Sequence, residues 1–132
     1  MGPCEGIPTE RLTQLAGEHT GLRVLVLFGS RARADAHARS DWDFGYLGDA
    51  RVDPAALVAS LVDCLGTERV DLTDLARAGA LLRFRAAAEG QPVYASDAAA
   101  FERFWLEAVS FWCDAAPTLR AGYADVLHRL RR

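Results

Sequence analysis

The chain of 132 residues contains no lysine, so that all 15 of its basic residues are arginine. This absence excludes mechanisms that need a lysine nucleophile or Schiff base, and it excludes a P-loop, whose lysine contacts nucleotide phosphates. Cysteine is scarce: Cys4, Cys64 and Cys113 are far apart and lack the spacing of a zinc site. We expect Cys64 to pack in a core, because it follows Leu57 and Leu61 at helical spacing.

Long hydrophobic stretches are also missing from the sequence. No segment has the length and purity of a membrane span, and no basic segment followed by an apolar one opens the chain as in a signal peptide. We therefore expect a cytoplasmic protein that does not bind membranes. The net charge of −3 argues against nucleic-acid binding. An apolar content of 51% in 132 residues predicts one folded domain over residues 1–132.

A short apolar run, residues 22–28, comes directly before a Gly-Ser pair. The run is rich in branched residues and bounded by glycines, which predicts a buried strand. Gly29 allows a tight turn and a close approach of the backbone to a ligand. Ser30 could cap a short helix, whose N-terminus would then bind phosphate. Arg31 and Arg33 could neutralise that phosphate, or they could lie in a solvated loop.

Three aspartates follow on two further expected strands. Asp41 and Asp43 share one face of a strand over residues 41–47, because side chains alternate between faces. Asp71 lies in an expected strand over residues 68–75, with apolar neighbours that face the other way. If the two strands are adjacent, the three carboxylates converge. Carboxylate oxygens suit Mg²⁺, and two such ions could clamp an in-line displacement at phosphorus, with Asp71 beside the attacking hydroxyl.

Each of these features alone has a simpler explanation. A Gly-Ser pair after a strand is often only a turn, and an Asp-x-Asp pattern is often a solvated strand face. Asp74 competes with Asp71 for the role of third carboxylate, although alternation along the strand places it on the other face. Ser30 is a poor hydrolase nucleophile, since no Gly-x-Ser-x-Gly elbow surrounds it. It is the order and spacing of the whole set that favour a functional site.

The pattern of Gly-Ser, ten residues and Asp-x-Asp resembles the signature of the polymerase-beta-type nucleotidyltransferase superfamily. More narrowly, the stretch Phe-Gly-Ser-Arg-Ala-Arg-Ala-Asp-Ala, followed by Ser-Asp-Trp-Asp-Phe, resembles the minimal nucleotidyltransferases, or MNT proteins. Asp71 matches the third carboxylate of that family. The resemblance covers about residues 20–97 and departs at Ala34, where the family often has glycine.

The resemblance implies a Mg²⁺-dependent enzyme that moves AMP from ATP to a hydroxyl group, with Asp41, Asp43 and Asp71 as catalytic and metal-binding residues. It implies that the acceptor is a tyrosine of a HEPN-type ribonuclease toxin, for which this chain would be the antitoxin. Two alternatives remain open: nucleotidylation of a small molecule such as an aminoglycoside, and an antitoxin that works by contact alone, without catalysis.

Caps, breakers and apolar periodicity predict an α/β fold, with a small mixed β-sheet flanked by helices in a core over about residues 20–97 and two C-terminal helices over about 97–132. Thr9 and Asp53 are expected N-caps. The expected helices cover residues 9–19, 54–65, 75–88 and 97–115, with a last one from Pro117, and the expected strands cover 22–28, 41–47, 68–75 and 92–94. One stripe of the helix over 97–115 is apolar and either covers the sheet or faces a partner: Phe101, Phe104, Trp105, Ala108, Phe111 and Trp112.

Overall fold

The computed structural model describes residues 7–29, 31–32 and 41–114. Ser30, Arg33 and the helix expected from Pro117 lie outside the described residues. The α/β fold class is confirmed. The elements in chain order are α1 (Thr9–Gly17), β1 (Leu22–Phe28), β2 (Trp42–Gly48), α2 (Pro54–Leu65), β3 (Val70–Asp74), α3 (Ala80–Glu89), β4 (Gln91–Ala95) and α4 (Ala100–Asp114).

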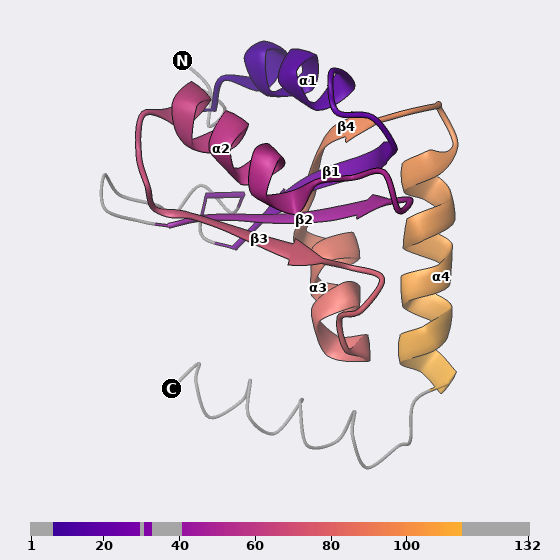
Figure 1. Cartoon of the computed structure of the whole chain (residues 1–132). Helices are drawn as coiled ribbons and strands as arrows, with labels where there is room; N and C mark the ends of the chain where they lie inside the picture. The colour runs from indigo at the N-terminus through magenta and orange to yellow at the C-terminus, as the bar shows by residue number, and fades with distance from the viewer. Residues whose placement is uncertain (1–6, 30, 33–40, 115–132) are drawn as a thin grey trace, which may run out of the picture.

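The strands form one mixed sheet in the order β3-β2-β1-β4. Strand β1 is antiparallel to both of its neighbours, β2 and β4, whereas β2 and β3 are parallel. A parallel pair needs a crossover connection, and α2 supplies it between β2 and β3. Figure 1 shows α1 and α2 on one side of the sheet and α3 and α4 on the other.

Each face of the sheet has its own core. Trp42, Phe44 and Tyr46, which alternate along β2, are buried against α1 and α2. The intervening positions of β2 therefore face α3 and α4. On that side Leu75 packs so close to Gly45 that an added Cβ would lie 2.8 Å from its side chain. The alternation along β2 thus fixes which face of the sheet each of its polar residues joins.

Some expected helix ends are confirmed and others are wrong. Asp53 caps α2 as expected, since its Oδ1 accepts from the backbone N–H of Ala56 at 3.2 Å. Thr9 is not the N-cap of α1 but its first residue. Helix α3 begins five residues after Leu75, because Leu75 is fully buried and Asp74 Oδ1 instead accepts from the N–H of Ala76 at 3.0 Å, which forms a turn.

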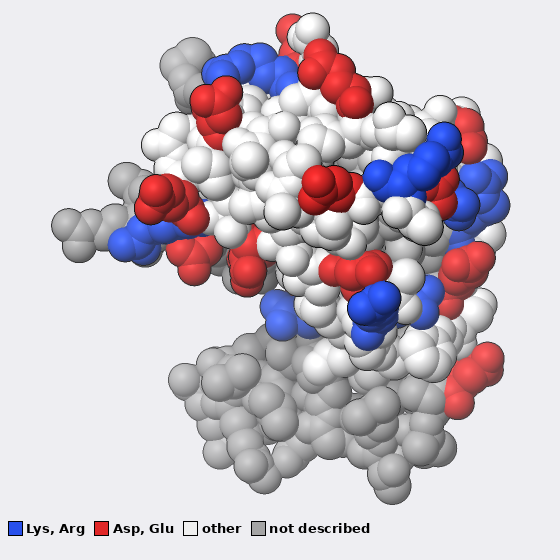
Figure 2. Space-filling view, in the orientation of Figure 1, with Lys and Arg blue, Asp and Glu red and all other residues white. Residues whose placement is uncertain are grey.

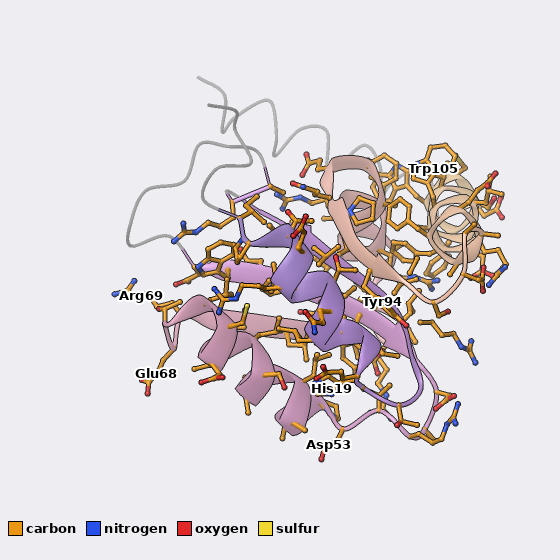
Figure 3. The ribbon with its side chains drawn as sticks, turned by 90° about the horizontal axis from the view of Figure 1, so that it is seen from above. His19, Asp53, Glu68, Arg69, Tyr94 and Trp105 are labelled. Atoms are coloured by element: carbon orange, nitrogen blue, oxygen red, sulfur yellow. The ribbon has the colours of Figure 1, made fainter. Side chains whose placement is uncertain are left out.

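The apolar residues of helix α4 divide between the core and the surface. Phe104 and Ala108 are buried in the core, whereas Trp105, Leu106 and Phe111 are exposed large hydrophobic residues. Figure 3 shows Trp105 on α4. The apolar stripe therefore both covers the sheet and leaves apolar surface at solvent. Within the described chain, none of the helices has the length and apolarity required to span a bilayer.

Candidate active site

The parallel pairing of β2 and β3 aligns two of the three aspartates. Asp43 and Asp71 are direct partners in the register. The ladder begins with the N–H of Trp42, which donates to the carbonyl oxygen of Arg69 at 2.8 Å. Asp41 comes directly before Trp42 and has the same parity as Asp43. The three aspartates therefore lie on one face of the sheet, at the end where β2 and β3 begin.

Gly29 lies against the middle member of this group. It directly follows β1, whose last residue, Phe28, pairs with Asp43. Its φ of +77° is favoured only by glycine. A Cβ added to Gly29 would lie 2.5 Å from Oδ2 of Asp43. The carboxylate of Asp43 thus packs over the Gly29 backbone, so that the turn and the strand acid form one structure.

Two of the three aspartates are exposed to solvent, whereas Asp43 is half-buried. The side chain of Asp41 is 65% exposed, and one of its oxygens lies 3.9 Å from Nη1 of Arg69. Asp71 is also exposed. Among the described residues, no group of three carboxylate, imidazole or thiol side chains is arranged to hold a metal ion. The backbone therefore aligns the three acids without gathering their side chains into a closed cage.

The donor set nevertheless fits a hard divalent cation. All three side chains carry carboxylate oxygens, the ligands that Mg²⁺ prefers, and Mg²⁺ usually takes only one or two carboxylates together with water and substrate phosphates. Because Gly29 has no side chain, the Asp43 carboxylate can lie directly against the backbone of the turn. An open, carboxylate-lined edge next to a turn is therefore suited to a metal that arrives with a phosphate ligand.

Arg31 contacts an aromatic residue of β2. Its Cζ is 4.3 Å from the centroid of the Trp42 ring, a cation–π contact. Trp42 belongs to the core under α1 and α2, whereas Asp43 faces α3 and α4. The guanidinium of Arg31 thus lies against the ring of the residue between Asp41 and Asp43. The described residues do not include Ser30 and Arg33, the other two expected nucleotide-binding residues.

Asp74 is separated from the site by the register. It pairs with Tyr46, near the other end of β2, and its carboxylate lies 3.7 Å from Nε of Arg77. Burial raises the pKa of Tyr46, and the charge of Asp74 raises it further, whereas Arg77 lowers it. Asp74 thus serves a turn and an ion pair, and only Asp71 faces the same way as Asp43.

Sequence reasoning assigned no role to Arg69. It lies two residues before Asp71, so that both side chains leave the same face of the strand. Figure 3 shows Arg69 beside Glu68, at the edge of the molecule. The spacing relative to Asp71 was the available signal, but the contact with Asp41 depends on the pairing of two distant segments.

A family model described as polymerase beta, nucleotidyltransferase, matches residues 10–99. One curated relative is the protein adenylyltransferase MntA of Aphanizomenon flos-aquae (strain 2012/KM1/D3). It is 28% identical over 95 residues, and the match covers 63% of this chain and 63% of that protein. The chain therefore spans less than two thirds of the length of the curated relative that it matches.

Solved structures share the fold. A chain in a crystal structure of a toxin–antitoxin with AMP-PNP superposes with a TM-score of 0.71 and 22% identity, over 96% of this chain and 100% of the other. A chain from the complex of tri-AMPylated Shewanella oneidensis HEPN toxin with MNT antitoxin gives a TM-score of 0.63 and 20% identity, over 99% and 100% of the two chains. The mixed sheet and its helices thus have the polymerase-beta-like nucleotidyltransferase fold.

Proposed function

Because the chain belongs to the polymerase beta nucleotidyltransferase family, we propose that it transfers AMP from ATP to a hydroxyl group in a Mg²⁺-dependent reaction. The observation that carries this proposal is the register of β2 and β3. It sets Asp43 opposite Asp71, with Asp41 on the same face. Three acids from two strands beside a glycine turn suit phosphoryl chemistry, in which the protein mainly positions groups and neutralises charge.

The proposal divides the residues between metal binding and nucleotide binding. Asp41, Asp43 and Asp71 hold up to two Mg²⁺ ions, which when bound stabilise the charge that develops on the phosphate oxygens. Gly29 lets the nucleotide approach the backbone, and Ser30, Arg31 and Arg33 bind its phosphates.

The transfer step needs only groups already named. The acceptor oxygen attacks the α-phosphorus of ATP, and the bond from that phosphorus to the bridging oxygen breaks. Pyrophosphate leaves with the bonding electrons. Asp71 orients the acceptor hydroxyl and accepts its proton. The order of the strands supports this assignment, since Gly29 directly follows β1, Asp41 and Asp43 lie at the start of β2, and β3 with Asp71 pairs with β2 on the side away from β1.

We propose a HEPN-type toxin as the acceptor protein, with modification at a tyrosine. The names of similar proteins support this choice, since one is a protein adenylyltransferase and another is an MNT antitoxin bound to an AMPylated HEPN toxin. The exposed Trp105, Leu106 and Phe111 on α4 offer apolar surface of the kind that anchors partners. A reaction that consumes ATP suits the cytoplasm, where we expect the protein to act.

The test is to co-express the chain with the protein encoded beside it and to measure the intact mass of that protein. We expect added AMP on a tyrosine, which Asp41→Asn abolishes and which Asp63→Asn, an exposed change on α2, leaves intact. An unmodified neighbour together with efficient labelling of an aminoglycoside would instead support the small-molecule alternative. Full neutralisation of the toxin by Asp41→Asn would support an antitoxin that acts by contact alone.

A further inference from the structure

The carboxylate of Asp41 already has a cationic neighbour. Nη1 of Arg69 lies 3.9 Å from Oδ1 of Asp41, and the two side chains are 58% and 65% exposed. Figure 2 shows acidic side chains with a basic one among them, at the edge of the molecule that also carries the labelled Arg69 in Figure 3. A positive charge thus stands beside the proposed metal ligands.

Two backbone hydrogen bonds fix the position of Arg69. Its carbonyl oxygen accepts from the N–H of Trp42 at 2.8 Å, which ties it to the start of β2. Its own N–H donates to Oγ1 of Thr67 at 3.2 Å, which holds the turn before β3. Because Arg69 and Asp71 are two residues apart, their side chains share one face. The backbone of Arg69 is therefore fixed so that its side chain leaves from the face that carries all three aspartates.

The contact involves one of the aspartates that the strand pairing aligns. The register sets Asp43 opposite Asp71, and Asp41 shares their face. One oxygen of the Asp41 carboxylate lies 3.9 Å from the guanidinium of Arg69. A divalent ion that uses this oxygen as a ligand therefore competes with Arg69 for it.

We propose that Arg69 is a positioning residue that holds the Asp41 carboxylate until a divalent metal replaces the guanidinium. This inference rests on the proposed function, because it takes Asp41 as a metal ligand. Arg69 opposes binding of the free metal, because its positive charge repels the ion and its guanidinium competes for the Asp41 oxygen. The pair is largely exposed, and exposed ion pairs are individually weak. We therefore expect an effect of about two- to fivefold on metal affinity.

The experiment measures Mn²⁺ binding to the nucleotide-free protein, by the loss of the electron paramagnetic resonance signal of free Mn²⁺. Arg69→Gln should lower the Kd for Mn²⁺ about two- to fivefold, and the difference should shrink in high salt. The matched control is Arg77→Gln, which removes an arginine 3.7 Å from Asp74, near the other end of the same strand. Its Kd should equal that of the wild type, and thermal melts should show that both variants fold.

A double-mutant cycle separates the pair from a general effect of charge. In an Asp41→Asn background, Arg69→Gln should no longer strengthen Mn²⁺ binding. If it strengthens binding as much as before, the effect comes from the field at the other acids and the inference is wrong. If Arg69→Gln does not change or weakens binding while Asp41→Asn still weakens it, the inference fails and the proposed metal site stands. If Asp41→Asn has no effect, or no variant binds Mn²⁺, the metal site and the inference fail together.

Discussion

The two ends of the sheet both carry aspartates, but they use them differently. At the end where β2 and β3 finish, Asp49 accepts hydrogen bonds from the backbone N–H and the guanidinium of Arg51, and Asp74 accepts from Ala76. At the end where β2 and β3 begin, Asp71 makes no hydrogen bond or ion pair within the described part of the chain, and Asp41 has only a long contact with an arginine.

The difference shows how a small fold separates structural acids from reactive ones. Asp49 stabilises a turn, because its oxygens accept hydrogen bonds from Arg51, and these hydrogen bonds lower the pKa of Asp49 to about 2. The register at the other end sets Asp43 opposite Asp71, and two like charges at paired positions repel each other. Such an arrangement is favoured where a cation binds between the carboxylates. We therefore expect substitutions at the two ends to have opposite consequences for activity and stability.

The largest effect is expected for the double variant Asp41→Asn with Asp43→Asn. Loss of the metal ligands should lower AMP transfer by ~10³ or more, since metal stabilisation of the transition state is worth several kcal/mol. The fold should persist, and the thermal midpoint should stay or rise slightly, because repulsion is removed. Transfer assays and thermal melts measure the two effects. An unfolded double variant would mean that these acids are structural, as at the other end.

The next effect separates the two acids on β3. Asp71→Asn should slow transfer by ~10²–10⁴, the usual contribution of a general base, and should weaken ATP binding only modestly. Asp74→Asn should leave transfer nearly unchanged, because its side chain serves the turn at Ala76 and faces Arg77. Single-turnover rates and ATP titrations of both variants test this. The reverse ranking would move the third carboxylate to Asp74.

A glycine pair sharpens the comparison between turn and site. Gly29→Ala should destabilise the fold by about 1–2 kcal/mol, the cost of a left-handed conformation for alanine, and should also impair transfer, because the new Cβ meets Asp43. Gly66→Ala is the matched control, since Gly66 has a φ of +69° with nothing within 4 Å of an added Cβ. It should cost stability without affecting transfer. Equal loss of transfer in both would contradict the special role of Gly29.

The smallest effect concerns the structural end in acid. The folded-state pKa of Asp49 is lowered from 3.8 to about 2, so that its carboxylate stabilises the fold above pH 3.8 and loses that effect as the pH falls toward 2. The side chain lies at the surface, so the change should be small. Urea midpoints of the wild type should therefore fall slightly more between pH 5 and pH 2 than those of Asp49→Asn, with equal transfer at neutral pH. A parallel fall would show that the pair does not contribute.

The features that depend on neighbouring residues in the chain could be predicted from the sequence. Strand alternation separates Asp71 from Asp74, and an Asp before a Pro predicts the capped start of α2 at Asp53. The beginning of α3 could not be predicted, since it depends on the burial of Leu75 and on the turn that Asp74 forms. Helical propensity is outweighed there by tertiary packing.

The details of the candidate site depended on contacts between distant segments. The register that pairs Asp43 with Asp71 is set across the α2 crossover, which sequence spacing does not determine. The stacking of Arg31 on Trp42 and the approach of Arg69 to Asp41 are likewise tertiary contacts. Sequence patterns therefore identify the three aspartates as candidates. The strand pairing is needed to show which of them align and which arginines lie near them.

The central claim is that the protein uses its three aligned aspartates to transfer AMP, with the α-phosphate of ATP, to a hydroxyl group. The most direct measurement incubates the chain, Mg²⁺ and the protein encoded beside it with ATP labelled at either the α- or the γ-phosphate. The account predicts that the α-label becomes covalently attached to the partner and that the γ-label leaves in pyrophosphate, with neither result in the double variant Asp41→Asn with Asp43→Asn. Attachment of the γ-label, or of the α-label by the double variant, would contradict the account.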